Sequence, residues 1–324
     1  MSTVDAASIA NNTSLDPVLG TNHTVLKIFL LLYNGLVIVM GLGGNALVLV
    51  GSLKHHAIQM DQRSVILLEN IAAADLLATV LQYVPMLVTL SAERWILGKF
   101  LCFCAVFRYI PFGVEAMLIA IMSCHRVRVL RSPLRRLLDP HLLKKVLVGV
   151  WLFYLITISC LTAIKPVIKY TPSALHCSSF EWDNMAAVPA YFRIMRLISG
   201  LYLFLPIVIT VIANVLILCL VFSSSTLPRP KNSKVVRTVS IICWVFIASY
   251  IPTVVIFSLP AVGISEIPLW VNCVSMYAVS FNLIANPVIY SFTNKKFAMF
   301  ARYFFTGRVK KFGRDYNMIL IKPS

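Results

Sequence analysis

Apolar residues dominate seven long stretches of this chain, and short polar segments separate them. A helix that crosses a membrane needs about 20 mostly apolar residues. The pattern predicts seven such helices, over about Ile28–Leu53, Val65–Leu90, Phe100–Leu130, Val146–Ile164, Leu197–Phe222, Val239–Gly263 and Ile267–Phe292. We therefore expect an all-α membrane protein whose core is a bundle of seven transmembrane helices.

A different pattern follows the seventh stretch. Phe297, Phe300, Ala301 and Phe304 recur at helical spacing, with cations between them. This spacing predicts a short amphipathic helix lying on the membrane surface, and the alternative is a frayed basic tail. The expected organisation is a polar tail over residues 1–26, a helical domain over 27–305 and a short basic tail over 306–324.

Composition and charge agree with a membrane protein. The chain is 59% hydrophobic and only 13% charged, whereas a soluble domain carries about 25% charged residues. The net charge of +17 does not indicate nucleic-acid binding, because 21 of the 29 Lys and Arg residues lie in segments on one side of the predicted helices. Cytoplasmic loops carry this excess, and they favour the anionic lipids of the inner leaflet. The N-terminus is then extracellular.

The polar N-terminal tail fits an exported segment. It lacks the apolar core of a signal peptide before Ile28, so the first helix would anchor itself. Asn11, Asn12 and Asn22 each begin an Asn-x-Ser/Thr sequon, which predicts glycosylation of the tail.

Each apolar stretch carries a polar, aromatic or proline landmark. In chain order these are Asn45 in Gly44-Asn45-Ala46-Leu47-Val48, Asp75, Trp95 with Cys102, Arg126, Trp151, Pro206, Phe246 with Pro252, and Asn286-Pro287-Val288-Ile289-Tyr290. This ordered set resembles the class A, rhodopsin-like G protein-coupled receptors, and the resemblance covers about Ile28 to Phe305. It implies a plasma-membrane receptor that binds an extracellular ligand and activates a heterotrimeric G protein. Arrestin and receptor kinases are further partners that it implies.

The resemblance also implies functional residues. They form the disulfide of the outer surface (Cys102 and Cys177), the central polar cluster that often surrounds a sodium ion (Asn45, Asp75 and Asn286) and the switch facing the G protein (His125, Arg126, Asn286, Pro287 and Tyr290). No other cofactor is expected. Within the last motif, Pro287 removes a backbone hydrogen bond, and we expect the preceding Asn286 to supply a polar partner for the freed group.

One departure from the family lies at the end of the third stretch. His125-Arg126-Val127 stands where the family usually has Asp-Arg-Tyr, so the acid that restrains the arginine is missing. One hypothesis is a weakened resting restraint and raised basal signalling. The alternative is that other groups hold Arg126.

A second departure is Glu115, which stands eleven residues before Arg126, where the family usually has a small polar residue. If the helix register holds, Glu115 faces Asp75 across the centre of the bundle. Two adjacent carboxylates do not easily ionise together. The site is therefore either a doubly acidic cation- or pH-sensitive centre, or it contains a protonated glutamic acid that serves as a structural donor.

The ligand pocket is expected around Arg108, Tyr109 and Tyr250, the last of which stands where the family usually has tryptophan. Without an acid at Arg108 or Tyr109, an amine ligand is disfavoured. Arg193 and Arg196 could add positive charge for an anionic small molecule or peptide. Alternatively, these two arginines extend to the membrane interface, and Arg108 pairs with Glu93, Glu181 or Asp183.

Other function classes fit less well. A photoreceptor needs a retinal-binding lysine, and the seventh stretch contains none. A transporter would show internal repeats or paired interrupted helices, and an enzyme would show a motif such as His-Glu-x-x-His. A receptor-like protein that does not couple to G protein remains an alternative, and a transporter is a less favoured one.

Overall fold

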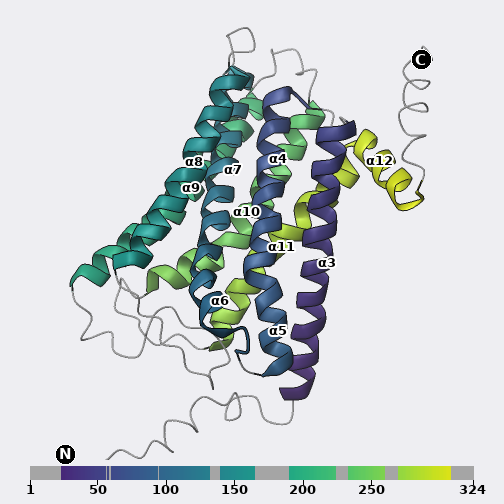
Figure 1. The fold of residues 1–324 in the computed structure, drawn as a ribbon. Helices are drawn as coiled ribbons and strands as arrows, with labels where there is room; N and C mark the ends of the chain where they lie inside the picture. Colours follow the sequence, from purple (N-terminus) through teal and green to yellow (C-terminus); the bar gives the residue numbers. More distant parts are fainter. Residues whose placement is uncertain are drawn as a thin grey trace, which may run out of the picture.

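The computed structural model describes residues 23–55, 57, 60–93, 95–131, 139–164, 190–223, 233–259 and 269–307. All the regular structure in these ranges is helical (Figure 1). The helices are α3 (His23–His55), α4 (Gln62–Ala78), α5 (Val84–Ala92), α6 (Gly98–Cys104), α7 (Tyr109–Arg131), α8 (Pro140–Ile164), α9 (Ala190–Ser223), α10 (Ser233–Ser258), α11 (Leu269–Thr293) and α12 (Lys295–Phe305).

The bundle is that of a seven-helix membrane protein, as the apolar stretches predict. Five described segments are long and apolar enough to cross a membrane: Lys27–Leu53, Gln62–Ala92, Tyr109–Arg131, Pro140–Cys160 and Thr238–Ile256. The described part of α9 adds a shorter apolar segment, Phe204–Leu220. Together with α11, these helices stand side by side in Figure 1 and give seven spans.

Burial in this bundle is the reverse of that in a soluble protein. Apolar side chains face outward, and Leu32, Val39 and Val148 are 70%, 68% and 59% exposed. Charged and amide side chains such as Asp75 and Glu115 lie inside, with at most 1% exposure. This arrangement suits a lipid environment, where the exposed apolar surface contacts hydrocarbon and the polar groups find partners within the bundle.

Two predicted helices are not continuous. The second span contains a π-helical turn, Thr79–Tyr83, between α4 and α5. Pro85 follows directly in α5, and a proline without an N–H accounts for the shift in hydrogen bonding. The predicted third span, about Phe100–Leu130, is likewise interrupted, because α6 passes through a 3₁₀ segment, Ala105–Arg108, into α7.

Close approaches between helices occur at several glycines, including Gly44 and Gly113. A Cβ on Gly44 of α3 would lie 2.6 Å from Cγ of Pro287 in α11, and a Cβ on Gly113 of α7 would lie 2.1 Å from Cε1 of Tyr154 in α8. Neither neighbour is compatible with an added methyl group. The two glycines therefore bring α3 against α11 and α7 against α8.

The short helix predicted after the seventh span is present as α12, which runs at an angle to the bundle in Figure 1. Asn294 caps it, since its side-chain oxygen accepts from the Phe297 N–H at 3.1 Å. Phe297 and Phe300 are fully buried, whereas Phe305 is 80% exposed. The segment is thus an amphipathic helix with one face packed on the bundle, as its apolar spacing predicts, and the alternative of a frayed tail is wrong.

Candidate functional site

A chain of buried polar side chains runs through the centre of the bundle. At its middle, Asn286 Nδ2 of α11 donates to Asp75 Oδ2 of α4 at 2.9 Å. Glu115 of α7 is the electrostatic neighbour of Asp75, and all three side chains have at most 1% exposure. The structure therefore brings together three of the four residues predicted for the central cluster.

Glu115 also connects two further helices to α7. Its Oε2 accepts from the Tyr250 hydroxyl of α10 at 2.8 Å, and its Oε1 accepts from Asn282 Nδ2 of α11. Tyr250 was predicted to line the ligand pocket, and Asn282 was not among the predicted site residues. A signal for Asn282 existed, because it lies four residues before Asn286 and therefore on the same helix face.

Asn45, the fourth predicted member, has a different role from the other three. Its Nδ2 donates to the carbonyls of Gly41 and Leu283, each at 3.0 Å. Leu283 is the residue whose carbonyl Pro287 cannot bond, since proline has no N–H. The prediction that Asn286 would compensate for the proline was wrong: Asn45 does so from another helix, and Asn286 bonds Asp75.

Several oxygen atoms at this centre have no hydrogen-bond partner in the described part of the protein. They are Oδ1 of Asn45, Asp75, Asn282 and Asn286. The oxygen of an amide lies about 2.2 Å from its nitrogen, so the free oxygens of Asn282 and Asn286 stand beside Glu115 and Asp75 respectively. Carboxylate and amide oxygens suit a hard cation or water. Within the described ranges, no group of three or more His, Cys, Asp or Glu residues forms a metal site.

A smaller polar contact lies one turn from Arg126. Ser123 Oγ of α7 stands 3.1 Å from Cys243 Sγ of α10 and accepts from Asn214 Nδ2 of α9 at 3.3 Å. All three residues are buried. Asn214 thus joins α9 to α7.

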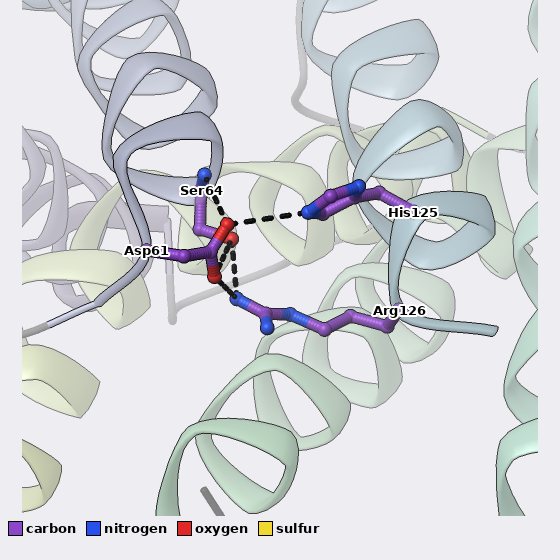
Figure 2. Close-up of polar contacts among 4 residues, drawn as sticks. All are labelled: Asp61, Ser64, His125 and Arg126. Atoms are coloured by element: carbon purple, nitrogen blue, oxygen red, sulfur yellow. Dashed lines mark hydrogen bonds and ion pairs between the residues drawn. The ribbon is translucent and has the colours of Figure 1, made fainter. Parts of the chain in front are cut away.

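The next polar group surrounds Arg126, which lies in the last two turns of α7, and we call this end of the bundle the Arg126 end. Arg126 is only 2% exposed, and its Nη2 donates to Asp61 Oδ1 at 2.9 Å and to the hydroxyl of Ser64. His125 Nε2 lies 3.2 Å from the other oxygen, Asp61 Oδ2. Figure 2 shows one carboxylate from the start of α4 facing both residues of α7.

Electrostatics keeps this carboxylate charged. Burial acts to raise the pKa of Asp61, but the contact with His125 and the positive charge of Arg126 outweigh it, with help from Ser64. The pKa of Asp61 is consequently held well below its usual range. Asp61 therefore remains an anion at any pH near neutrality.

The contact with Asp61 agrees with the alternative interpretation of His125, in which other groups hold Arg126, because Asp61 supplies a carboxylate to it. Raised basal signalling stays a prediction. Asp61 and Ser64 were not among the predicted site residues. The sequence did point to Asp61, because the segments on the basic side of the bundle contain only three acidic residues, Asp61, Asp139 and Asp315.

Tyr290, predicted in the same switch, is not bonded to Arg126. It is 1% exposed, its hydroxyl has no hydrogen-bond partner among the described groups, and its ring packs edge-on against Phe297 at 6.2 Å between centroids. The structure thus packs Tyr290 against α12, places Asn286 beside Asp75, and joins His125 and Arg126 through Asp61, so the predicted switch residues do not form one group.

At the opposite end, Arg108 and Tyr109 interact with each other. Arg108 Nη2 donates to the Tyr109 hydroxyl at 3.4 Å, and its guanidinium lies 5.2 Å from the centroid of that ring. Glu93, one suggested partner of Arg108, pairs instead with Lys27. In the described ranges no carboxylate pairs with Arg108, and Tyr250 belongs to the Glu115 group rather than to this one.

Other predicted residues are described only in part. Cys102 is fully buried and disulfide-bonded, while its expected partner Cys177 lies outside the described residues. Arg193 and Arg196 belong to α9 by their backbone, and their side chains lie outside the described part. The sequons predict glycosylation of three residues outside the described ranges, Asn11, Asn12 and Asn22.

Sequence comparison adds one family. Residues 44–290 match the family model described as 7 transmembrane receptor (rhodopsin family), which covers most of the chain and all the polar groups of the bundle centre. No individual curated protein matches the chain.

Proposed function

Because this chain belongs to the rhodopsin family of seven-transmembrane receptors, we propose that it transmits the binding of an extracellular ligand to a heterotrimeric G protein. The observation that carries the proposal is Arg126, a charged residue that is 2% exposed at one end of the bundle. The Asp61 carboxylate and the Ser64 hydroxyl hold it there through noncovalent contacts that can break. Its release would expose a cation to a docking protein.

The proposed orientation places the Arg126 end in the cytoplasm of a plasma-membrane protein. The concentration of 21 of 29 Lys and Arg residues in segments on that side supports this orientation. These basic segments would dock the G protein and contact anionic lipids. Receptor kinases and arrestin would act on the same face.

The proposed ligand carries a negative charge. Arg108 supports it, since its only described polar contact is the long hydrogen bond to Tyr109. A carboxylate or phosphate of a small molecule or peptide would offer this guanidinium a stronger, charge-assisted bond. Replacing Arg108 with Gln should then weaken the response to an anionic agonist much more than replacing Lys27, a cation paired with Glu93, does.

We also propose that the central cluster holds water or one sodium ion. The free oxygens of Asn282, Asn286 and Asp75 would contribute ligands, and the ion would offset the carboxylate charge inside the membrane. Glu115 is the carboxylate that we assign as charged, because donors reach both of its oxygens. Loss of a sodium-dependent rise in thermal stability in Glu115→Gln, with a normal rise in the wild type, would support this site.

The test of coupling compares Arg126→Ala with Arg128→Ala at matched surface levels. Arg128 lies on the same helix and is exposed, so it controls for loss of one positive charge. We expect G protein activation, basal or agonist-driven, to disappear only in Arg126→Ala. Equal activation in both variants would favour the alternative, a member of the family that does not couple through this residue.

A further inference from the structure

Asp61 uses one carboxylate for two different structural contacts. It is the N-cap of α4, where Oδ2 accepts from the Ser64 N–H at 3.2 Å and Oδ1 accepts from the Ser64 hydroxyl at 2.9 Å. The same two oxygens face Arg126 at 2.9 Å and His125 at 3.2 Å (Figure 2). The Asp61 side chain therefore joins the start of α4 to the end of α7, and the Ser64 hydroxyl adds a second contact to Arg126.

No other carboxylate in the described ranges reaches Arg126. The sequence of α10 contains no Asp or Glu, so it has no acidic group to offer. Asp139, at the same end of the bundle, accepts instead from the Leu142 N–H at 3.3 Å at the start of α8. Asp61 thus supplies the negative charge that His125 does not.

The pair is well suited to a reversible contact. The side chain of Arg126 is 3% exposed and that of Asp61 is 27% exposed, so water reaches one partner and not the other. A buried guanidinium without a counter-charge is unfavourable, and Arg126 therefore needs either Asp61 or another partner. The cap at Ser64 does not depend on Arg126, so the helix start survives release of the arginine.

We propose that Asp61 is the residue that restrains Arg126 in the resting receptor, and that this restraint ties α7 to α4 instead of to α10. Asp61 is a positioning residue that acts through Arg126. At this level α10 is held to α7 by the neutral Ser123–Cys243 contact. Among the side chains that the structure describes, outward movement of α10 then breaks no ion pair, and activation is limited by the release of Arg126 from the start of α4. This inference rests on the proposed role of Arg126 in coupling.

The experiment separates the charge of Asp61 from its capping role. Asparagine caps a helix about as well as aspartate, so Asp61→Asn keeps the start of α4 and removes the negative charge. Asp139→Asn makes the same change at the start of α8, away from Arg126. Hydrogen–deuterium exchange of residues 123–131 in purified receptor, and basal G protein activation at matched surface levels, are the two readouts.

We expect Asp61→Asn to raise the exchange rate of residues 123–131 by about 10–150-fold, as loss of one charge-assisted bond implies, and to raise basal activation. Asp139→Asn should change neither. In an Arg126→Gln background, Asp61→Asn should have no further effect on exchange, whereas a purely capping role would still add one.

Unchanged exchange in Asp61→Asn would overturn the proposal, as would equal rises in both Asn variants or an undiminished effect without Arg126. Raised exchange in Asp61→Asn, with no G protein activation in any variant, would support the proposed restraint and refute the proposed coupling. The two ideas therefore fail by different observations.

Discussion

The hydroxyl of Tyr250 offers the sharpest test of the central polar group. Its oxygen donates to Glu115 Oε2 at 2.8 Å, and its ring lies 4.3 Å from that of Phe246 between centroids. Tyr250→Phe keeps the ring and its stacking and removes only the donor. A hydrogen bond to a charged group contributes about 1.5–3 kcal/mol, and one between neutral groups about 0.5–1.5 kcal/mol.

We assign the charge to Glu115, so Tyr250→Phe should lower the free energy of unfolding by about 1.5–3 kcal/mol. For a protein of 324 residues that corresponds to a fall of roughly 2–4 °C in the unfolding midpoint. Thermal unfolding of purified receptor in detergent measures it. Tyr250→Phe and Glu115→Gln should also be non-additive, since both remove the same contact.

Tyr290→Phe is the matched control. Both tyrosines are 1% exposed, but the Tyr290 hydroxyl has no hydrogen-bond partner in the described part of the protein. Removing it should leave the midpoint unchanged or raise it slightly, because an unpaired buried hydroxyl is unfavourable. Equal midpoints for the two variants would show that the Tyr250–Glu115 bond does not stabilise the bundle, and a fall near the lower, neutral range would show that Glu115 is protonated.

Three further changes test other contacts. Gly44→Ala places a Cβ 2.6 Å from Pro287 and should destabilise the bundle by about 1–3 kcal/mol, whereas Gly43→Ala, with no atom within 4 Å, should stabilise it slightly; thermal unfolding of both checks this. Asn45→Ala leaves the carbonyl that Pro287 frees without its side-chain donor and should cost about 1–3 kcal/mol by the same assay. An unfolding midpoint equal to that of the wild type would contradict it. Because the folded pKa of Asp61 is lowered, its contribution is present above the unfolded pKa of about 3.9 and lost as pH falls below it; acid unfolding of wild type and Asp61→Asn should therefore converge only below about pH 4, and convergence near pH 6 would refute the assignment.

The location of the restraint changes how this receptor is expected to open. The ion pair joins α4, which begins at this side of the bundle, to α7, which ends there. The contact described here between α10 and α7, that of Ser123 with Cys243, is neutral. The energetic barrier to exposing Arg126 then depends on the segment before α4. Substitutions around Asp61 should influence basal activity more than substitutions on α10 at the same level.

The sequence by itself determined the architecture. A span of about 20 apolar residues has few alternatives in a membrane, because every backbone group must be satisfied within a helix. The spacing of Phe297, Phe300 and Phe304 likewise determined α12. These are local properties of length and period, and they do not depend on which helix becomes a neighbour.

Only the tertiary structure decided which polar groups meet. Asn45 rather than Asn286 satisfies the carbonyl freed by Pro287, and Asp61 takes the place of the acid missing at His125. Each pair is joined across helices, so the partner depends on the rotation and depth of two helices relative to each other. The apolar period defines a broad face of a helix, whereas a hydrogen bond requires a specific atom within about 3 Å, and packing of the whole bundle sets that distance.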